Sequence, residues 1–364
     1  MTDPLTNWGW SPDRNSTIDE TLTGPREGLI PGRIIREDRG SCRVETSRGR
    51  KVCRLAGSFR HGLTRRSDYP SVGDWVLLSP EGETGLIREI LPRRGILSRK
   101  VPGEETEEQI LGSNIDKVLV VYALDGGRSF SARGLERYLT LVWEGGAQPL
   151  LVLNKLDLCT DLVPFLTAVE EAAPGVPLFL LSATEGEGVE SLRSVLRPGE
   201  TVVLIGPSGV GKSSIINALG QRELQKTGER REEDRRGRHT TTHRELFRLP
   251  SGLLLLDSPG LREMQLWGSG ETAGRVFPEV EILAEQCRFT DCTHTAEPGC
   301  AVRDALEKGT LAEERFNSYQ ELQRELAYLN RREDDKAARE EKNRWKKISQ
   351  SAKELNKDRK RRYN

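Results

Sequence analysis

The chain has 364 residues, a formal net charge of zero, and 31% charged against 35% hydrophobic residues. This length suits about two or three domains with a sizeable core. No apolar run approaches the roughly 18 residues of a membrane span, and the N-terminus lacks the basic-then-apolar order of a signal peptide. We therefore expect a cytoplasmic protein outside the membrane, in which the distribution of charge is more informative than its sum.

The first segment, residues 1–27, carries little hydrophobic periodicity and predicts a mobile tail. Trp8 and Trp10 are unusual in such a segment, and the alternative is that they dock on a surface that the sequence does not identify. Residues 28–95 predict a domain of short strands separated by glycines and turn signals. Five such strands suit a small β-barrel of the OB-fold type. The expected strands are Leu29–Arg36, Ser41–Thr46, Lys51–Leu55, Asp74–Ser79 and Thr84–Leu91.

The loops of this barrel are basic, and OB-folds often bind nucleic acid through such loops. The alternative is a solvated surface on a docking domain, but the clustering of positive charge favours RNA. The basic residues are Arg48, Arg50, Lys51, Arg54, Arg60, His61, Arg65 and Arg66.

From residue 96 to residue 270 the pattern changes to continuous apolar strands that alternate with helices. This pattern predicts an α/β domain with a parallel sheet covered on both faces, after a linker at Arg93–Gly112. The expected strands are Lys117–Leu124, Pro149–Leu153, Leu178–Leu181, Thr201–Ile205 and Leu253–Leu256, and the expected helices are Gly134–Trp143 and Ser214–Leu219.

A candidate base-binding motif, Asn154-Lys155-Leu156-Asp157, directly follows the second of these strands. Open α/β sheets bind ligands at this end of their strands. The Asp157 carboxylate can accept hydrogen bonds from guanine N1–H and its 2-amino group, which adenine does not offer, so discrimination of about 10⁴-fold is attainable. Asn154 would support the loop, Lys155 would lie over the purine, and Ser182 and Ala183 would complete the pocket. Alone, the motif is also typical of a helix N-cap turn.

A phosphate-binding loop follows the strand Thr201–Ile205 and precedes a helix, which is the context that the pattern requires. Its glycines let backbone N–H groups approach a phosphate, Lys212 would reach the β- and γ-phosphates, and Ser213 would hold Mg²⁺. The alternative is a simple glycine-rich turn. The residues of this candidate site are Gly206, Pro207, Ser208, Gly209, Val210, Gly211, Lys212, Ser213 and Ser214.

Two further motifs suggest nucleotide-sensing segments. A hydroxyl of Thr240 or Thr241 would ligate Mg²⁺, Asp257 would hold the magnesium shell directly or through water, and the Gly260 N–H would contact the γ-phosphate. Leu261 stands where Ras-like enzymes carry a catalytic Gln. His239 is then the nearest candidate to position the attacking water, the alternative being a mobile surface histidine.

Together these are the guanine-nucleotide motifs of small GTPases in a different order, because the base motif precedes the phosphate loop. We interpret this order as a circular permutation, which leaves the assembled site intact. The competing class is a P-loop kinase or ATPase, and Asn154–Asp157 argues against it.

Residues 271–330 contain a candidate metal site and are expected to be mainly helical, with helices at Thr272–Glu285 and Ala301–Lys308. Three thiolates and one imidazole form the closed tetrahedral set that structural Zn²⁺ prefers; the alternative is a set of unligated cysteines. Residues 331–364 hold 14 Lys/Arg against 7 Asp/Glu and predict a basic helical or disordered arm. The expected zinc ligands are Cys287, Cys292, His294 and Cys300.

Taken together, the sequence resembles the RsgA (YjeQ) family of circularly permuted GTPases. The resemblance rests on VGDWV at Val72–Val76, ILPRRGILSR, NKLD, GPSGVGKSS, GRHTTT, DSPG and CRFTDCTHTAEPGCAV. It implies an OB-fold, a permuted GTPase domain and a zinc domain. It also implies binding to the small ribosomal subunit and its rRNA late in maturation, with GTP hydrolysed to GDP, stimulation by the subunit, and use of the histidine at position 239.

We expect a monomer that needs Mg²⁺ with GTP. The alternative function is a nucleotide-gated RNA-binding module with slow hydrolysis that ribosomes do not stimulate.

Overall fold

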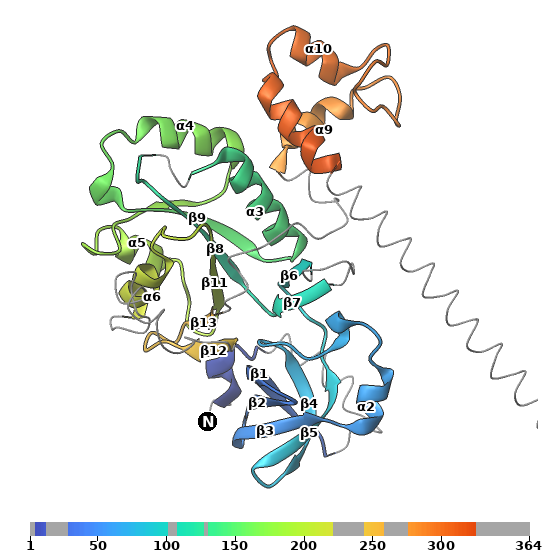
Figure 1. Cartoon of the computed structure of the whole chain (residues 1–364), viewed down its shortest axis with the longest axis vertical. Helices are drawn as coiled ribbons and strands as arrows, with labels where there is room; N and C mark the ends of the chain where they lie inside the picture. Colours follow the sequence, from blue (N-terminus) through green and yellow to red (C-terminus); the bar gives the residue numbers. More distant parts are fainter. Residues whose placement is uncertain are drawn as a thin grey trace, which may run out of the picture.

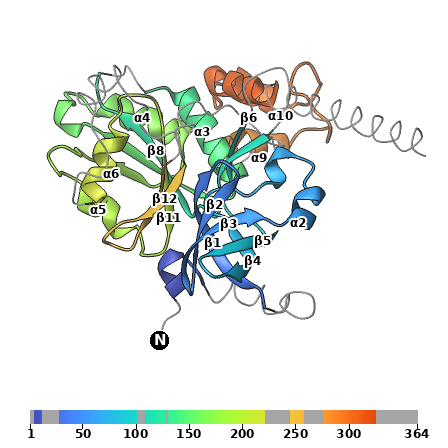
Figure 2. The same ribbon diagram turned by 60° about the horizontal axis from the view of Figure 1, so that its bottom comes forward.

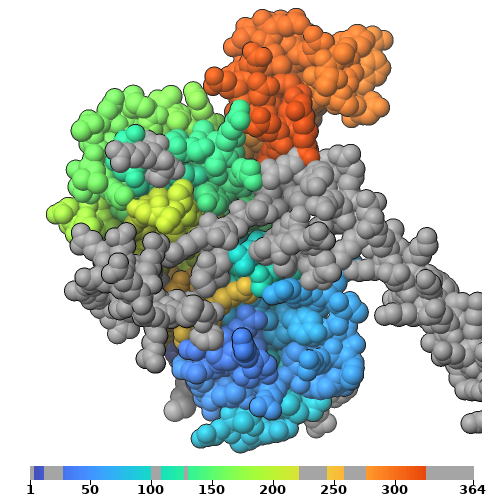
Figure 3. All heavy atoms as spheres, viewed as in Figure 1, coloured from blue at the N-terminus to red at the C-terminus, as the bar shows by residue number. Residues whose placement is uncertain are grey.

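The computed structural model describes residues 4–11, 28–100, 108–126, 130–220, 244–257 and 276–324. These residues form an N-terminal barrel, a central α/β domain and a C-terminal helical module (Figure 1). In the space-filling view, the barrel lies at the bottom and the C-terminal module at the top, with the α/β domain between them (Figure 3). The fold class predicted from the sequence is therefore confirmed.

The barrel closes because its fourth strand pairs with both the first and the fifth. Only the third and fifth strands run parallel to each other. Inward-facing side chains such as Ile34, Val44 and Ile87 are fully buried. The strand order β1-β2-β3-β5-β4 is OB-like, as the sequence predicted. The strands are β1 (Ile30–Asp38), β2 (Ser41–Thr46), β3 (Gly49–Leu55), β4 (Trp75–Glu81) and β5 (Thr84–Ile90), with α2 (Gly57–Gly62) and η2 (Arg66–Asp68) between β3 and β4.

The N-terminal segment packs on the barrel through a short 3₁₀ helix, η1 (Pro4–Trp8). Leu5 is fully buried, Trp10 is 7% exposed, and the Trp10 ring centroid lies 4.5 Å from that of Trp75. The prediction of a mobile tail is therefore wrong for residues 4–11. The reason is that its apolar side chains cover a patch on the outside of the barrel.

The segment predicted as a linker instead contains a two-stranded antiparallel sheet, β6 (Leu97–Lys100) and β7 (Glu108–Gly112). Leu97 and Leu111 point into the core of the α/β domain and are almost completely buried. The linker interpretation was wrong because the apolar pattern of these two strands is short and is surrounded by charged residues, so it gives little periodicity in the sequence.

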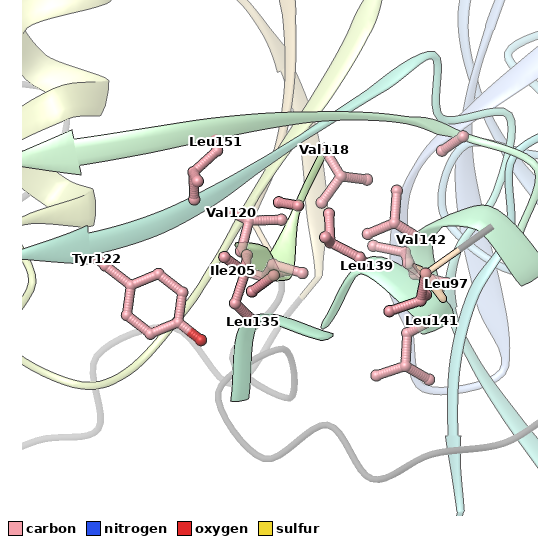
Figure 4. Close-up of a cluster of buried hydrophobic side chains, with 14 of the residues drawn as sticks. Leu97, Val118, Val120, Tyr122, Leu135, Leu139, Leu141, Val142, Leu151 and Ile205 are labelled. Atoms are coloured by element: carbon pink, nitrogen blue, oxygen red, sulfur yellow. The ribbon is translucent and has the colours of Figure 1, made fainter. Parts of the chain in front are cut away.

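The α/β domain is built on five parallel strands that carry helices on both faces. On one face, Leu135 and Leu139 pack against Val118 and Val120 (Figure 4). The other face is covered by a separate apolar cluster. The parallel strands, in spatial order, are β10 (Leu178–Leu180), β9 (Gln148–Asn154), β8 (Lys117–Ala123), β11 (Thr201–Ile205) and β13 (Leu254–Asp257); α3 (Ala132–Glu144) and α4 (Val163–Ala172) cover the first face, and α5 (Val189–Ser194) and α6 (Lys212–Gly220) the second.

An antiparallel strand that the sequence did not predict, β12 (Glu245–Arg248), joins the barrel to this sheet. It pairs with β13 on one side and with β1 on the other, where Arg36 is opposite Glu245 and the two side chains lie 3.6 Å apart. A second link is the buried Arg33 of β1, which donates a 2.7 Å hydrogen bond to the Thr201 hydroxyl. Barrel and sheet are thus connected through both backbone and side chains.

The C-terminal module contains α9 (Pro278–Ala284), α10 (Ala301–Glu307) and helical residues from 313 to 324. It contacts the α/β domain through Arg315, which pairs with Glu136 of α3 and with Glu279. The helix that begins at residue 313 continues to residue 324, the last described residue. None of the helices within the described residues has the length and apolar character needed to cross a bilayer.

Candidate functional site

The candidate nucleotide-binding motifs meet at the carboxyl edge of the parallel sheet. Asn154 ends β9, Gly206 follows β11, Asp257 ends β13, and Ser182 lies just after β10. Carboxyl ends of parallel strands share one edge, where such sheets bind ligands. The topology therefore brings together motifs that are about 100 residues apart in the sequence.

Two glycines of the phosphate loop are required by close packing. Gly206 has φ +137°, and a Cβ there would lie 2.1 Å from the Val121 carbonyl oxygen of β8. Gly211 has φ +95°, and a Cβ there would lie 2.2 Å from Asn154 Nδ2. A side chain at either position would push the loop away from the sheet edge.

Lys212 lies over its own loop at the start of α6. Its Nζ donates to the carbonyl oxygens of Gly206 at 2.7 Å and Pro207 at 2.5 Å. The side chains of Ser213 and Ser214 on the first turn are partly exposed, and Ser208 and Gly209 at the loop tip are exposed. An ammonium group beside a helix N-terminus suits a phosphate.

Asn154 connects the three loops of the candidate site. Its buried side chain donates from Nδ2 to the Val210 carbonyl at 2.9 Å. Its Oδ1 accepts from the Ala183 N–H at 3.0 Å. The base motif, the phosphate loop and the loop after β10 are therefore held by one amide.

The Asp157 carboxylate lies on the exposed side of the same region. Its Oδ1 accepts a 2.5 Å hydrogen bond from the Ser182 hydroxyl, which also lies 3.1 Å from the Thr184 hydroxyl. A carboxylate has about four acceptor positions, so Asp157 can still accept two N–H groups from a base. The sequence predicts only a backbone role for Ser182, because a short motif gives no signal for this hydroxyl contact.

Lys155 adopts a left-handed backbone conformation with φ +64° and ψ +42°. Its Nζ lies 3.5 Å from a carboxylate oxygen of Asp125, the acidic residue two positions after β8. This ion pair, also missed in the sequence, lies beside the base motif and orients the lysine stem.

Several predicted nucleotide-sensing residues lie outside the described residues: His239, Thr240, Thr241 and Gly260. Their roles stay predictions. Asp257 is described, is half-buried, and pairs with Glu245 across β12 and β13. Strands β11 and β13 are neighbours in the sheet. Ser213, on the helix that follows β11, and Asp257, the last residue of β13, therefore lie at the ends of adjacent strands.

The four predicted zinc ligands converge in the C-terminal module, with all ligand atoms within 4.8 Å of one another. The Sγ atoms of Cys287 and Cys300 are 3.8 Å apart, and they lie 3.6 Å and 3.5 Å from His294 Nδ1. A tetrahedral Zn²⁺ with S and N ligands has edges of about 3.8 Å and about 3.5 Å, because Zn–S is about 2.3 Å and Zn–N about 2.0–2.1 Å. Cys287, His294 and Cys300 therefore already have the spacing of three tetrahedral zinc ligands, and Cys292 lies within 4.8 Å of them as the fourth.

Glu297, which no sequence motif indicates, organises the loop between Cys292 and Cys300. Its carboxylate accepts hydrogen bonds from the hydroxyl and N–H of Thr293 and from the N–H groups of Thr295 and Ala296. These bonds, the Thr293 hydroxyl foremost, hold the pKa of Glu297 well below its usual range. The loop is thus ordered by a carboxylate outside the candidate ligand set.

Two of the basic residues expected to face RNA have protein partners instead. The Lys51 side chain is buried and donates to the Gly82 carbonyl, and Arg50 pairs with Glu45 at 2.6 Å. The structure corrects the prediction for Lys51, because a buried ammonium cannot contact a phosphate backbone. Arg65 and Arg66 remain exposed.

Comparisons with known proteins agree with this geometry. The RsgA GTPase family profile matches residues 90–267; an ABC transporter profile matches residues 189–358, a span that also contains the phosphate loop. A protein of Oceanobacillus iheyensis named small ribosomal subunit biogenesis GTPase RsgA 1 is 46% identical over 324 residues, which cover 88% of this chain and 92% of that protein. The Opitutus terrae protein named small ribosomal subunit biogenesis GTPase RsgA is 45% identical, over 89% of this chain and 91% of its own length.

Solved structures give the same assignment. The crystal structure of YjeQ from Thermotoga maritima matches with a TM-score of 0.62 at 27% identity, over 82% of this chain and 99% of that one. The structure of YloQ, described as a circularly permuted GTPase, matches with a TM-score of 0.60 at 28% identity, over 83% and 96%. With a permuted GTP site, an OB-like barrel and near-complete coverage of these relatives, the chain belongs to the RsgA GTPase family and is a GTP hydrolase.

Proposed function

We propose that this chain binds the small ribosomal subunit late in its maturation, hydrolyses GTP there with stimulation by the subunit, and is released afterwards. The observation that carries the proposal is the pair of hydrogen bonds by which Asn154 links the base motif to the phosphate loop and to the loop after β10. The relatives of this chain are named small ribosomal subunit biogenesis GTPases, which supports the choice of partner. We further propose that the protein is monomeric and cytoplasmic, and that it contacts rRNA.

In the proposed site each residue has a limited task. Asp157 accepts the guanine N–H groups, and Asn154 keeps its loop against the phosphate loop. The N–H groups of residues 208–213 and Lys212 bind the phosphates. Mg²⁺, which neutralises phosphate charge when bound, would be held by Ser213, Thr241 and Asp257. His239 would orient the attacking water, and the Cys₃His site would hold structural zinc.

The domain division also remains a proposal: a tail at 1–27, an OB-fold RNA-binding domain at 28–95, a GTPase domain at 96–270, a zinc domain at 271–330 and a basic extension at 331–364. In Figure 2 the barrel and the C-terminal module lie on the same side of the GTPase domain, one beside the other. Such an arrangement would let an RNA particle contact both modules at once.

The test is GTP hydrolysis by the purified protein alone and with small subunits, large subunits or whole ribosomes. We expect stimulation only by the small subunit, and its loss in Lys212→Ala. Equal rates under all four conditions would favour the alternative, a nucleotide-gated RNA-binding module with slow hydrolysis. Nucleotide affinity, measured in parallel, separates loss of binding from loss of turnover.

A further inference from the structure

A cavity of about 670 Å³ lies where the barrel meets the GTPase domain, and none of its lining residues belongs to the candidate nucleotide site. Its walls come from β1, from the segment around η2, from β7 and from the residue that precedes β12. The volume is within the range of about 300–1,000 Å³ that is typical of small-ligand sites. The residues that matter for its chemistry are Glu37, Arg65, Arg66, Tyr69 and Arg244.

The charge of this cavity is mainly positive. Arg65 and Arg66 are exposed, while the side chain of Arg244 is 15% exposed and donates to the Ile110 carbonyl at 2.8 Å. Glu37 lies 3.5 Å from Arg244. Three guanidinium groups against one carboxylate leave an excess of positive charge that suits an anion.

Burial lowers the pKa of Arg244, although Glu37 opposes the shift; Arg99 and Arg66 lower the pKa further. Burial likewise raises the pKa of Glu37, although Arg244 opposes it. The lowered pKa of Arg244 and the raised pKa of Glu37 both mean that the charged forms of these side chains are incompletely solvated. An anion among the guanidinium groups would stabilise their charge.

Tyr69 adds an aromatic wall to the charged groups. The residue is 39% exposed, while its backbone is fixed by a 2.6 Å hydrogen bond from Arg93 Nη2 to its carbonyl. Arg93 in turn holds the buried Asp74 through two 2.8 Å hydrogen bonds. Tyr69 is thus an accessible aromatic residue of the cavity lining, and Arg93 holds its backbone.

We propose that this cavity binds one unpaired nucleotide of an RNA strand, with a phosphate against Arg65 and Arg66 and the base stacked on Tyr69. Basic grooves with aromatic stacking surfaces are the usual means of binding single-stranded nucleic acid. An acidic peptide would satisfy the guanidinium groups but would leave the tyrosine ring without a planar partner. The inference rests on the proposed function for the source of the RNA, the small ribosomal subunit.

One residue of the cavity lining, Arg244, is also close to the predicted magnesium ligand Asp257 through the strand that follows it. Arg244 immediately precedes β12, and the next residue, Glu245, is opposite Asp257 on β13. Arg244, which lines the cavity, therefore adjoins the strand pair that ends in the predicted magnesium ligand Asp257. We expect occupancy of the cavity to increase GTP hydrolysis.

The experiment measures binding of fluorescein-labelled octauridylate to the full-length protein at several salt concentrations. Tyr69→Ala should weaken binding about tenfold, because stacking on one aromatic ring is lost, whereas Tyr69→Phe should bind as the wild type does. Arg66→Ala should reduce the slope of log K against log salt by about 0.7, as expected for one lost phosphate contact on a single strand. Arg88→Ala, which removes an exposed arginine of β5 outside the cavity, is the matched control and should leave the slope unchanged.

The same variants are then tested with small ribosomal subunits. If the wild type binds subunits and both Tyr69→Ala and Arg66→Ala bind equally well, the inference is overturned while the proposed function stands. If the wild type binds no subunit, the proposed function fails. The octauridylate affinities of the Tyr69→Ala and Arg66→Ala variants then show by themselves whether the cavity binds RNA. Displacement of octauridylate by an equally charged oligoglutamate with the same affinity would assign the cavity to acidic peptides and overturn the inference.

Discussion

The side-chain amide of Asn154 donates a 2.9 Å hydrogen bond to the main-chain carbonyl of Val210, which joins the base motif directly to the phosphate loop. The same side chain accepts a hydrogen bond from the N–H of Ala183. Because Gly211 leaves only enough space for this amide, the contact depends on a glycine in the phosphate loop. The three loops therefore behave as one preorganised unit.

Replacing Asn154 with Ala should weaken both GTP and GDP binding about tenfold or more. The change leaves the Val210 carbonyl and the Ala183 N–H without their partner, at a cost of about 1–3 kcal/mol for each buried group that stays unsatisfied. Fluorescent-nucleotide titration measures the affinity. Thr167→Ala, which removes an exposed hydroxyl on α4 bonded to Val163, is the control and should bind normally. Normal nucleotide affinity in Asn154→Ala would contradict the proposed bridging role.

Asp157→Asn should reduce the preference for GTP over ATP and ITP. The amide still accepts from Ser182, but one carboxylate oxygen that would accept the guanine N–H groups is replaced by a donor. Competition titrations with the three nucleotides give the selectivity. Ser182→Ala, which removes only the supporting hydroxyl, should lower affinity modestly and keep selectivity. Full guanine selectivity in Asp157→Asn would show that Asp157 does not contact the base.

The sequence identified the elements whose periodicity is strong, and missed those that depend on tertiary contacts. The five barrel strands and the apolar strands of the sheet follow from local patterns. Strand β12 has only four residues and exists by pairing with β1 and β13. The docking of Trp10 on Trp75 likewise depends on a surface about 65 residues away, which local periodicity cannot indicate.

The same distinction holds at the site. Motif spacing indicated Asn154, Asp157, the phosphate loop and the four side chains that could hold a metal ion. It did not indicate the Ser182 hydroxyl on Asp157 or the Glu297 carboxylate that orders the loop between the metal ligands. These contacts are single side chains without a repeating pattern, so only the folded chain identifies them.

Zinc removal should change the reactivity of three cysteines and leave two others protected. Burial raises the pKa of Cys42 to about 12 and that of Cys53 to about 11, so both thiols should resist iodoacetamide in the folded protein. Cys287, Cys292 and Cys300 should react only after chelation, and the partly exposed Cys159 is the internal reference. Mass spectrometry of alkylated peptides, with zinc analysis, makes the test. Equal alkylation of the three ligands with and without chelator would refute the zinc site.

The pair Glu136–Arg315, which attaches the C-terminal module to α3, should make stability depend on pH. The Glu136 side chain is 7% exposed, and burial raises its pKa, although Arg315 opposes the shift. The folded state then keeps the proton at a higher pH than the unfolded state, whose pKa lies near the usual 4.5. The stabilising contribution of the protonated group is complete below that pKa and is lost as pH rises through the higher folded pKa.

Glu136→Gln cannot titrate, so the free energy of unfolding of the wild type minus that of this variant should fall as pH rises from about 4 to 7. Within the window the slope can reach about 1.4 kcal/mol per pH unit. Urea unfolding of both proteins across this range measures the difference, in which other titrating groups cancel. Glu321→Gln is the control, because it removes the exposed partner of Arg133, and exposed pairs contribute only about 0–1 kcal/mol. A wild-type advantage that grows with pH would mean that attraction to Arg315 outweighs the burial of Glu136.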